Sequence, residues 1–213
     1  MSERAFDIEK RSFEIIDSEV GEHGYEEMQW TIVRRVVHAT ADFDFATGKS
    51  KIIFHAAAIR SSFAAMKNQC AVVSDVDMVL AAINKKSLAS LNLRPRCYIS
   101  DLSLAEQSRT AGRTRSELAM RRAAEEINGG IVVIGNAPTA LYELIRMIRE
   151  GIALPALVVG IPVGFVSAPE SKEELARLDI PFITNSGRKG GSPAASSIIN
   201  ALMLLYQNAK SSS

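Results

Sequence analysis

Residues 131–150, IVVIGNAPTALYELIRMIRE, decide the fold class of this chain. The first four residues are apolar and mostly β-branched, which predicts a strand that is buried on both faces. Gly135 and Asn136 then interrupt the apolar run, and Pro138 suits the first turn of a helix. The stretch that follows is amphipathic, so we expect a helix near 138–150. A strand, a turn and a helix in this order are typical of α/β proteins with a parallel sheet.

The same alternation of short apolar runs and amphipathic stretches continues from residue 68 almost to the end of the chain. Strands that are apolar throughout and separated by helices indicate a parallel sheet covered on both faces. The pattern therefore predicts a three-layer α/β/α fold with a mainly parallel sheet of about five strands. We expect strands at 70–73, 97–99, 131–134, 157–159 and 182–183, and helices near 75–83, 114–128, 138–150, 170–178 and 193–208.

The first third of the chain has a different pattern. Apolar residues in the segment 13–37 recur at helical spacing. There is no internal repeat, and no linker rich in Pro, Gly or Ser separates two regions of different composition. We therefore expect a single α/β domain over 1–213, with a helical segment 1–68 that packs on the sheet and a disordered tail at 209–213.

Composition excludes several classes of protein. Lys and Arg total 25 and Asp and Glu total 24, so the net charge is +1. This balance argues against a nucleic-acid protein that depends on bulk positive charge, although a local basic cluster could bind an acidic small molecule. Residues 151–169 carry no charge, but Gly and Pro interrupt them, which favours a strand and a loop over a membrane span. We expect a soluble protein with neither nucleic acid nor membrane as a partner.

The two cysteines, Cys70 and Cys97, lack the spacing of a disulfide framework or a CxxC pair. No cluster of Cys and His surrounds them in the sequence, so we expect no metal site. The N-terminal segment is charged and has no apolar stretch of the kind found in signal peptides. These features indicate a cytoplasmic, reduced protein.

Ligands of open parallel sheets bind beyond the carboxyl ends of the strands, so the residues there are candidates for a site. Asp75, Asn136 and Arg188 each follow a predicted strand, and we expect them to contact a ligand. Residues 187–192, GRKGGS, have the composition of an anion-binding loop before a helix, with Arg188 and Lys189 as charges for carboxylates. The segment matches neither the phosphate-loop nor the dinucleotide spacing. A tight turn that needs glycine only for its backbone is the alternative.

Helix capping is an alternative explanation for Asn136 and for the segment 114–117. Asn136 could cap the helix that starts near Pro138. Thr114 and Glu117 fit a capping box, which does not require the Arg115 between them. An arginine at a helix N-terminus opposes the helix dipole, so Arg115 points to a further role in binding an anion.

His38 is the histidine with the most distinctive position, because it ends the helix-like run 30–37. Histidine can donate or accept a proton at cellular pH, and a helix C-terminus favours its protonated form. A purely structural histidine is the alternative. His38 and Asp42, four residues apart, could pair, but two ligands are too few to define a metal site.

Taken together, six segments resemble the precorrin-8X methylmutase family of cobalamin biosynthesis. Each motif alone is weak, but six in order and at family spacing are highly specific, and the resemblance runs from about residue 6 to residue 208. The segments are RVVHATAD (35–42), TRS (114–116), GNAPTAL (135–141), PVGFV (162–166), ESK (170–172) and GRKGGS (187–192), and IEKRSFEII (8–16) fits as well.

This resemblance implies an isomerase that moves a methyl group between adjacent ring carbons of precorrin-8X or cobalt-precorrin-8, giving hydrogenobyrinate or cobyrinate. It implies an α/β/α fold, no cofactor, and a homodimer that binds the tetrapyrrole near the subunit interface. His38 matches the histidine held to protonate or hydrogen-bond the macrocycle. Ser12 and Arg115 match substrate-contact positions of the family.

Several segments look more like the anaerobic, cobalt-containing branch of the family than the metal-free branch: 39–44, 83–85, 96–101 and Lys189. Ala82 departs from the family, which commonly has Gly there. Two other functions stay open at this point. One is a corrinoid-binding carrier without catalysis, and the other is a nucleotide- or phosphate-dependent α/β enzyme.

Overall fold

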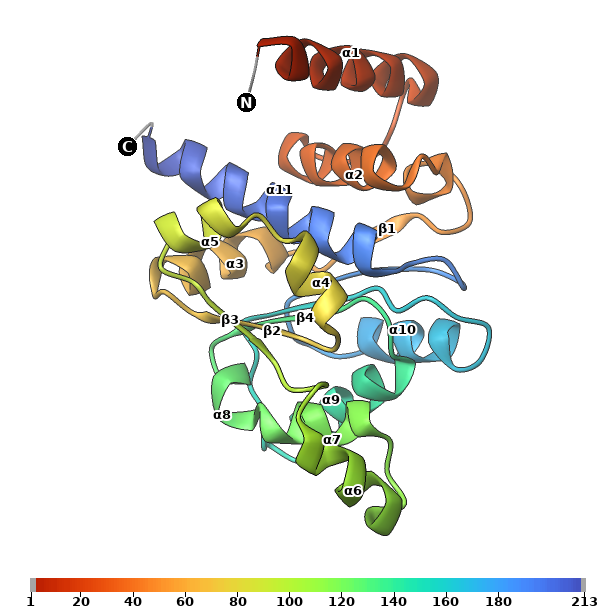
Figure 1. Cartoon of the computed structure of the whole chain (residues 1–213). Helices are drawn as coiled ribbons and strands as arrows, with labels where there is room; N and C mark the ends of the chain where they lie inside the picture. The colour runs from red at the N-terminus through yellow and green to blue at the C-terminus, as the bar shows by residue number, and fades with distance from the viewer. Residues whose placement is uncertain (1–2, 212–213) are drawn as a thin grey trace.

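The computed structural model describes residues 3–211. A six-stranded sheet crosses the molecule in the order β1-β6-β5-β4-β2-β3 (Figure 1). All neighbouring strands are parallel except β1, which runs antiparallel to β6. The strands are β1 (Ile52–Phe54), β2 (Ala71–Ser74), β3 (Arg94–Cys97), β4 (Ile131–Ile134), β5 (Leu157–Gly160) and β6 (Phe182–Asn185).

Helices cover both faces of this sheet (Figure 1). On one face lie α3 (Ala58–Lys67), α4 (Asp77–Ala82), α5 (Lys85–Ser90) and α11 (Ser192–Ser211). On the other lie α7 (Arg115–Arg122), α8 (Ala124–Ile127), α9 (Pro138–Arg149) and α10 (Ala168–Ala176), with α6 (Leu102–Ala111) against α7. The predicted α/β fold class with a mainly parallel sheet is confirmed.

Successive side chains of the central strands point alternately into the two hydrophobic clusters, one on each face of the sheet. In β4, Ile131 and Val133 pack into the cluster with α11, whereas Val132 and Ile134 pack into the cluster with α9. All four side chains are fully buried. Successive side chains of a strand point to opposite faces, so a strand with helices on both sides must be apolar at every position.

The N-terminal segment is arranged differently from the prediction that 1–68 is helical and packs on the sheet. Helix α2 (Glu27–Thr40) lies against α11, and α1 (Glu3–Val20) lies against α2, so these helices form further layers outside the sheet (Figure 1). Strand β1 joins the sheet at its edge. Its three residues are too few to show a strand pattern between helical segments.

The prediction of a strand at 97–99 was wrong in position, because β3 ends at Cys97. This edge strand reads Arg-Pro-Arg-Cys, and its first three residues are exposed, so it carries no apolar run. Proline is tolerated at a sheet edge, where its missing N–H is not needed. Helices α5 and α6 were not expected. Helix α11 continues through Ser211, so 209–211 are helical rather than disordered, and 212–213 lie outside the described residues.

No helix within residues 3–211 is long and apolar enough to cross a membrane. The stretch 151–169 forms β5 with a loop on either side of it, as the sequence predicted, and ends in the first two residues of α10.

The core on the α9 side gives a direct test of the fold. Leu144 of α9 is fully buried, whereas Leu154 exposes 67% of its surface. We expect Leu144→Ala to lower the free energy of unfolding by about 2–5 kcal/mol, because it removes apolar contacts and leaves a cavity. Leu154→Ala should change it by less than about 0.5 kcal/mol. Urea unfolding of both variants checks this, and equal effects would contradict the packing described.

Candidate active site

Asp75 joins the loops that follow two neighbouring strands. It comes directly after β2, and its carboxylate accepts hydrogen bonds from the backbone N–H groups of Gly135 (3.0 Å), Asn136 (2.8 Å) and Ala137 (2.7 Å) after β4. Its side chain is fully buried. Burial raises the pKa of Asp75, and the three N–H donors act against that rise. Asp75 therefore positions the 135–137 loop instead of offering a carboxylate to a ligand, which revises the expectation of substrate contact.

Asn136 lies at the surface of that loop. The N-cap residue of α9 is Ala137, with no side-chain cap, and Pro138 occupies the first turn. The alternative that Asn136 caps this helix was therefore wrong. Its exposed side chain is available to a ligand at the carboxyl edge of the sheet.

The loops after β5 and β6 are tied together at the same edge. Gly164 donates to the carbonyl of Arg188 (3.0 Å), and Gly191 donates to the carbonyl of Ile161 (3.0 Å). A Cβ on Gly190 would lie 2.4 Å from the carbonyl oxygen of Ile161, so this close approach requires glycine. Backbone hydrogen bonds thus join the 187–192 segment to the loop after β5, so it is not an isolated tight turn.

Arg188 and Phe165 form an exposed pair on these two loops. The guanidinium of Arg188 lies 5.3 Å from the centre of the Phe165 ring, and Phe165 exposes 81% of its surface. A cation stacked on an aromatic face keeps its outer N–H groups free to bind an anion. The pair offers both charge and an apolar surface.

Lys189 connects the same segment to the end of helix α2. Its ammonium group lies 2.7 Å from the carboxylates of both Asp42 and Asp44. Asp42 also accepts from the N–H of Asp44 (3.0 Å) in η1 (Phe43–Phe45). Asp42 is therefore engaged with Lys189, and the predicted pairing with His38 has no bond in this structure.

The structure brings His38 and Ser12 together. Both line a cavity of about 270 Å³ between α1 and α2, together with Ile15, Val37 and Phe43 among others. The His38 ring lies 5.3 Å from that of Phe13, edge to face. Ser12 donates its hydroxyl to the carbonyl of Ile8 (2.8 Å). The imidazole is exposed near the last turn of α2, which leaves it accessible to a ligand.

Arg115 lies on another part of the molecule. It is the first residue of α7 and is exposed. The predicted capping box is confirmed, because Thr114 accepts from the N–H of Glu117 (3.2 Å) while the Glu117 carboxylate accepts from the N–H of Thr114 (2.7 Å). Arg115, Asn136 and Arg188 do not line the cavity of His38 and Ser12.

The buried carboxylate of Glu143 forms an ion pair with Arg113, the residue before this capping box. Glu143 of α9 has a side chain that is 1% exposed and accepts from Arg113 at 3.1 Å. Arg121 and Arg146 also form ion pairs with it. The sequence does not predict this cluster, because Arg113 and Arg121 lie 30 and 22 residues before Glu143 and only Arg146 is on the same helix.

Lys172 is a second buried charged residue that the sequence does not predict. Its side chain is 1% exposed, and its ammonium group donates to Asn185 Oδ1 (3.1 Å) and to the carbonyl of Lys189 (2.8 Å). Burial lowers the pKa of Lys172 to about 8. Lys172 lies in ESK (170–172), one of the segments that resemble the family. Its expected place in a helix does not show whether its side chain is buried.

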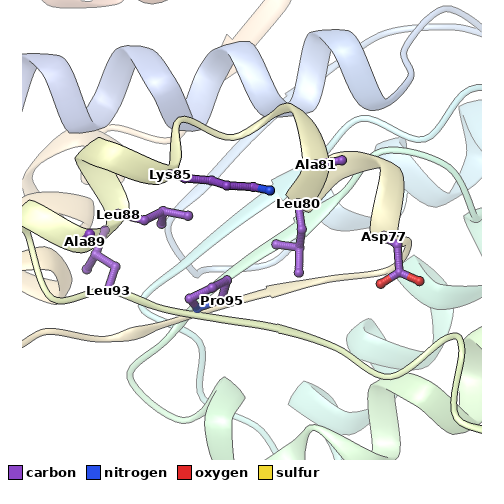
Figure 2. A pocket seen from close by; sticks show the side chains of 8 residues that line it. All are labelled: Asp77, Leu80, Ala81, Lys85, Leu88, Ala89, Leu93 and Pro95. Carbon is purple, nitrogen blue, oxygen red and sulfur yellow. The ribbon is translucent and has the colours of Figure 1, made fainter.

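A larger cavity of about 490 Å³ opens between α4, α5 and β3 (Figure 2). Its walls are mainly apolar, and Asp77 and Lys85 are its charged residues. Asp77 accepts from the hydroxyl of Ser100 (2.5 Å). None of the six expected site residues lines this cavity. Among residues 3–211, no cluster of three or more His, Cys, Asp or Glu side chains could hold a metal ion.

The fold and these groups define an α/β protein whose candidate site lies at the carboxyl ends of parallel strands, suited to an acidic ligand with apolar surfaces. The chain belongs to the precorrin-8X methylmutase family, whose model matches residues 7–205. It is therefore a methyl-shifting isomerase of cobalamin biosynthesis.

Relatives and solved structures agree with this assignment. The chain is 48% identical to the cobalt-precorrin-8 methylmutase of Priestia megaterium over 198 residues, which cover 93% of this chain and 87% of the relative. It is 35% identical to the precorrin-8X methylmutase of Pseudomonas aeruginosa over 92% of this chain and 93% of the relative. The precorrin-8x methyl mutase structure from Thermus thermophilus superimposes with a TM-score of 0.87 at 35% identity, covering 95% and 97% of the two chains.

The low pKa of Lys172 predicts how stability depends on pH. An unfolded lysine keeps its proton to about pH 10.5, whereas Lys172 in the folded protein loses it near pH 8. Above pH 8 the unfolded state binds more protons, so a rise in pH favours the folded state. We expect the free energy of unfolding of wild type, relative to Lys172→Met, to rise by about 1.4 kcal/mol per pH unit between about pH 8.5 and 10.

Urea unfolding at several pH values measures this difference. Lys67→Met, at an exposed lysine of α3, is the control and should show a difference from wild type that does not change over this range. A constant difference for Lys172→Met as well would show that Lys172 titrates normally.

Proposed function

We propose that this protein converts cobalt-precorrin-8 to cobyrinate, with the macrocycle bound over the carboxyl edge of the sheet and His38 as the proton donor. The observation that carries this reading is the cavity shared by His38 and Ser12, two residues from different helices that match family positions. The choice of the cobalt-containing substrate rests on relatives named cobalt-precorrin-8 methylmutase, with identities of 48%, 44% and 37%.

The surface chemistry of this edge supports an amphipathic, acidic ligand. Large apolar side chains are unusually exposed in the loops and helix starts that follow β2, β3 and β5, and such patches mark binding surfaces. Arg115 and Arg188 are exposed cations that could bind the acetate and propionate carboxylates of the ring. The apolar residues are Met78, Leu102, Val163, Phe165 and Val166, with exposed fractions of 68, 87, 45, 81 and 81%.

The proposed catalytic contribution is electrostatic. A migrating methyl group has no polar atoms that the enzyme could bind, so catalysis must favour the rearranged, protonated π-system of the ring. An imidazole that donates a proton or a hydrogen bond to the macrocycle does this. In this proposal Ser12 contacts the ring beside His38, Asn136 and Arg188 contact the ring edges, and Asp75 acts only through the loop that it positions.

A homodimer is part of this proposal. The cavity of His38 and Ser12 has a volume of about 270 Å³, below the roughly 300–1,000 Å³ usual for small-molecule sites, and a corrin ring is a large ligand. We infer that a second subunit adds the missing walls near the interface.

We also infer a cytoplasmic location, since Cys70 and Cys97 are both unpaired.

The role of His38 is tested by substitution. We expect His38→Ala to reduce turnover of cobalt-precorrin-8 by about 10²–10⁴-fold, the usual contribution of a general acid. His23→Ala is the matched control, because His23 stacks on Trp30 away from the cavity, and it should keep nearly full activity. Turnover is followed by the visible spectrum, and near-normal turnover of His38→Ala would remove this residue from the mechanism.

Turnover and thermal unfolding distinguish the isomerase from a corrinoid carrier and from a nucleotide-dependent enzyme. A carrier would bind cobyrinate tightly but would not convert excess substrate with a catalytic amount of protein. Stabilisation against thermal unfolding by nucleotides, and not by corrinoids, would favour a nucleotide-dependent enzyme instead.

The shared site is tested by sedimentation and subunit mixing. We expect the protein to sediment at twice the 23.1 kDa mass of its chain at micromolar concentration. If His38 of one subunit and Arg115 of the other form one site, mixed His38→Ala and Arg115→Ala subunits regain about a quarter of wild-type activity, since half the dimers then hold one intact site. A monomer, with or without corrinoid, would contradict the proposed dimer, and a dimer without restored activity would contradict the shared site.

A further inference from the structure

The burial of Lys172 lowers the stability of the folded protein. An ammonium group that leaves water loses its hydration, and buried lysines are rare unless they are paired. Both bonded acceptors of Lys172, the Asn185 side chain and the Lys189 carbonyl, are neutral. A buried positive charge without an opposite charge, beside loops of a site, calls for a functional explanation.

The contacts of Lys172 converge on one peptide of the 187–192 segment. The Lys189 carbonyl accepts from Lys172 Nζ (2.8 Å) and from Asn185 Nδ2 (2.9 Å). Asn185 is itself buried at the end of β6. This peptide adjoins Arg188, the cation stacked on Phe165. Lys172 therefore fixes the backbone from which the exposed guanidinium extends.

The same peptide links Lys172 to the turn after His38. The side chain of Lys189 reaches Asp42 and Asp44, both at 2.7 Å. This turn begins at Ala41, whose left-handed backbone (φ 52°) ends α2. A continuous set of bonds thus runs from the buried ammonium group through Lys189 to the segment that follows the proposed proton donor.

We propose that Lys172 is a positioning residue of the methylmutase, whose buried ammonium group holds the 187–192 segment in place and provides a fixed positive charge behind the substrate carboxylates. This inference rests on the proposed binding of the tetrapyrrole at this edge. It assigns Lys172 to substrate binding through the loop and its charge, not to contact with the reacting carbons.

The surroundings of Lys172 explain why its charge would respond to an acidic ligand. Burial accounts for its lowered pKa, and the arrival of a polyacid at the 187–192 segment would favour the charged form again. Binding should therefore draw a proton onto Lys172 near pH 8. The charged and titratable groups on its own helix and on the elements packed against it are Glu170, Glu173, Glu174, Tyr142, Glu143, Arg146, Arg149, Arg188 and Lys189.

Steady-state kinetics of two variants test the positioning role. Both variants have an unbranched or planar side chain one atom shorter than lysine: Lys172→Met loses both donor and charge, whereas Lys172→Gln loses the charge and keeps an N–H donor. We expect KM for cobalt-precorrin-8 to rise by about 10–100-fold in both, the range for losing one charge-assisted interaction, with kcat within about 3-fold of wild type. Lys67→Met, at an exposed lysine of α3, should match wild type.

The possible results separate the parts of the proposal. An unchanged KM in Lys172→Met would overturn it, and normal KM in Lys172→Gln alone would overturn the role of the charge. A fall in kcat at constant KM would place Lys172 in the chemical step and would also contradict it. Circular dichroism and thermal unfolding confirm that the variants compared are folded.

Proton uptake on product binding is a second readout that does not depend on turnover. Calorimetric titration of wild type with cobyrinate at pH 8, in two buffers of different ionisation enthalpy, measures the protons taken up. We expect uptake by wild type and by Lys67→Met, and an uptake smaller by a sizeable fraction of a proton in Lys172→Gln. Equal uptake in all three would overturn the proposal, whereas tight binding without turnover in wild type would refute only the isomerase function.

Discussion

Parallel pairing of β2, β4, β5 and β6 is the constraint on which the rest of the structure depends. Because these strands run in one direction, the segments after them meet at a single edge of the sheet. Strands covered on both faces are mainly apolar, so charged groups lie outside them, and the polar Ser74, Thr184 and Asn185 occur toward the carboxyl ends of β2 and β6. The edge carries the exposed Asn136 and Arg188 for this reason, and the turn after His38 joins it through Lys189.

Two buried side chains, Asp75 and Lys172, hold the loops of this edge in place. Asp75 fixes the loop after β4 by accepting three N–H groups, and Lys172 fixes the loop after β6 by donating to a carbonyl. Opposite charges thus perform the same task, because a peptide offers both donors and acceptors. Their burial costs free energy, but it preorganises loops whose own sequences are rich in glycine and would otherwise be loose.

The sequence was sufficient for the parts of the fold that follow from hydrophobic pattern, such as β4 with α9 and the capping box before α7. It failed at β1 and β3, because a three-residue strand and an exposed Arg-Pro-Arg edge carry no such pattern. His38 and Ser12 were found together only through resemblance to a family, since neither spacing nor composition links them. The roles of Asp75, Glu143 and Lys172 depend on long-range contacts that only the folded chain reveals.

The central claim is that the macrocycle lies over the carboxyl edge of the sheet and meets His38 there. A crystal structure of the protein with bound cobyrinate measures this most directly. The account predicts density for the ring within hydrogen-bonding distance of the His38 imidazole, with its carboxylates at Arg188 and at Arg115 of the same or the partner subunit. A ring bound in the cavity between α4, α5 and β3, which His38 does not line, would contradict it.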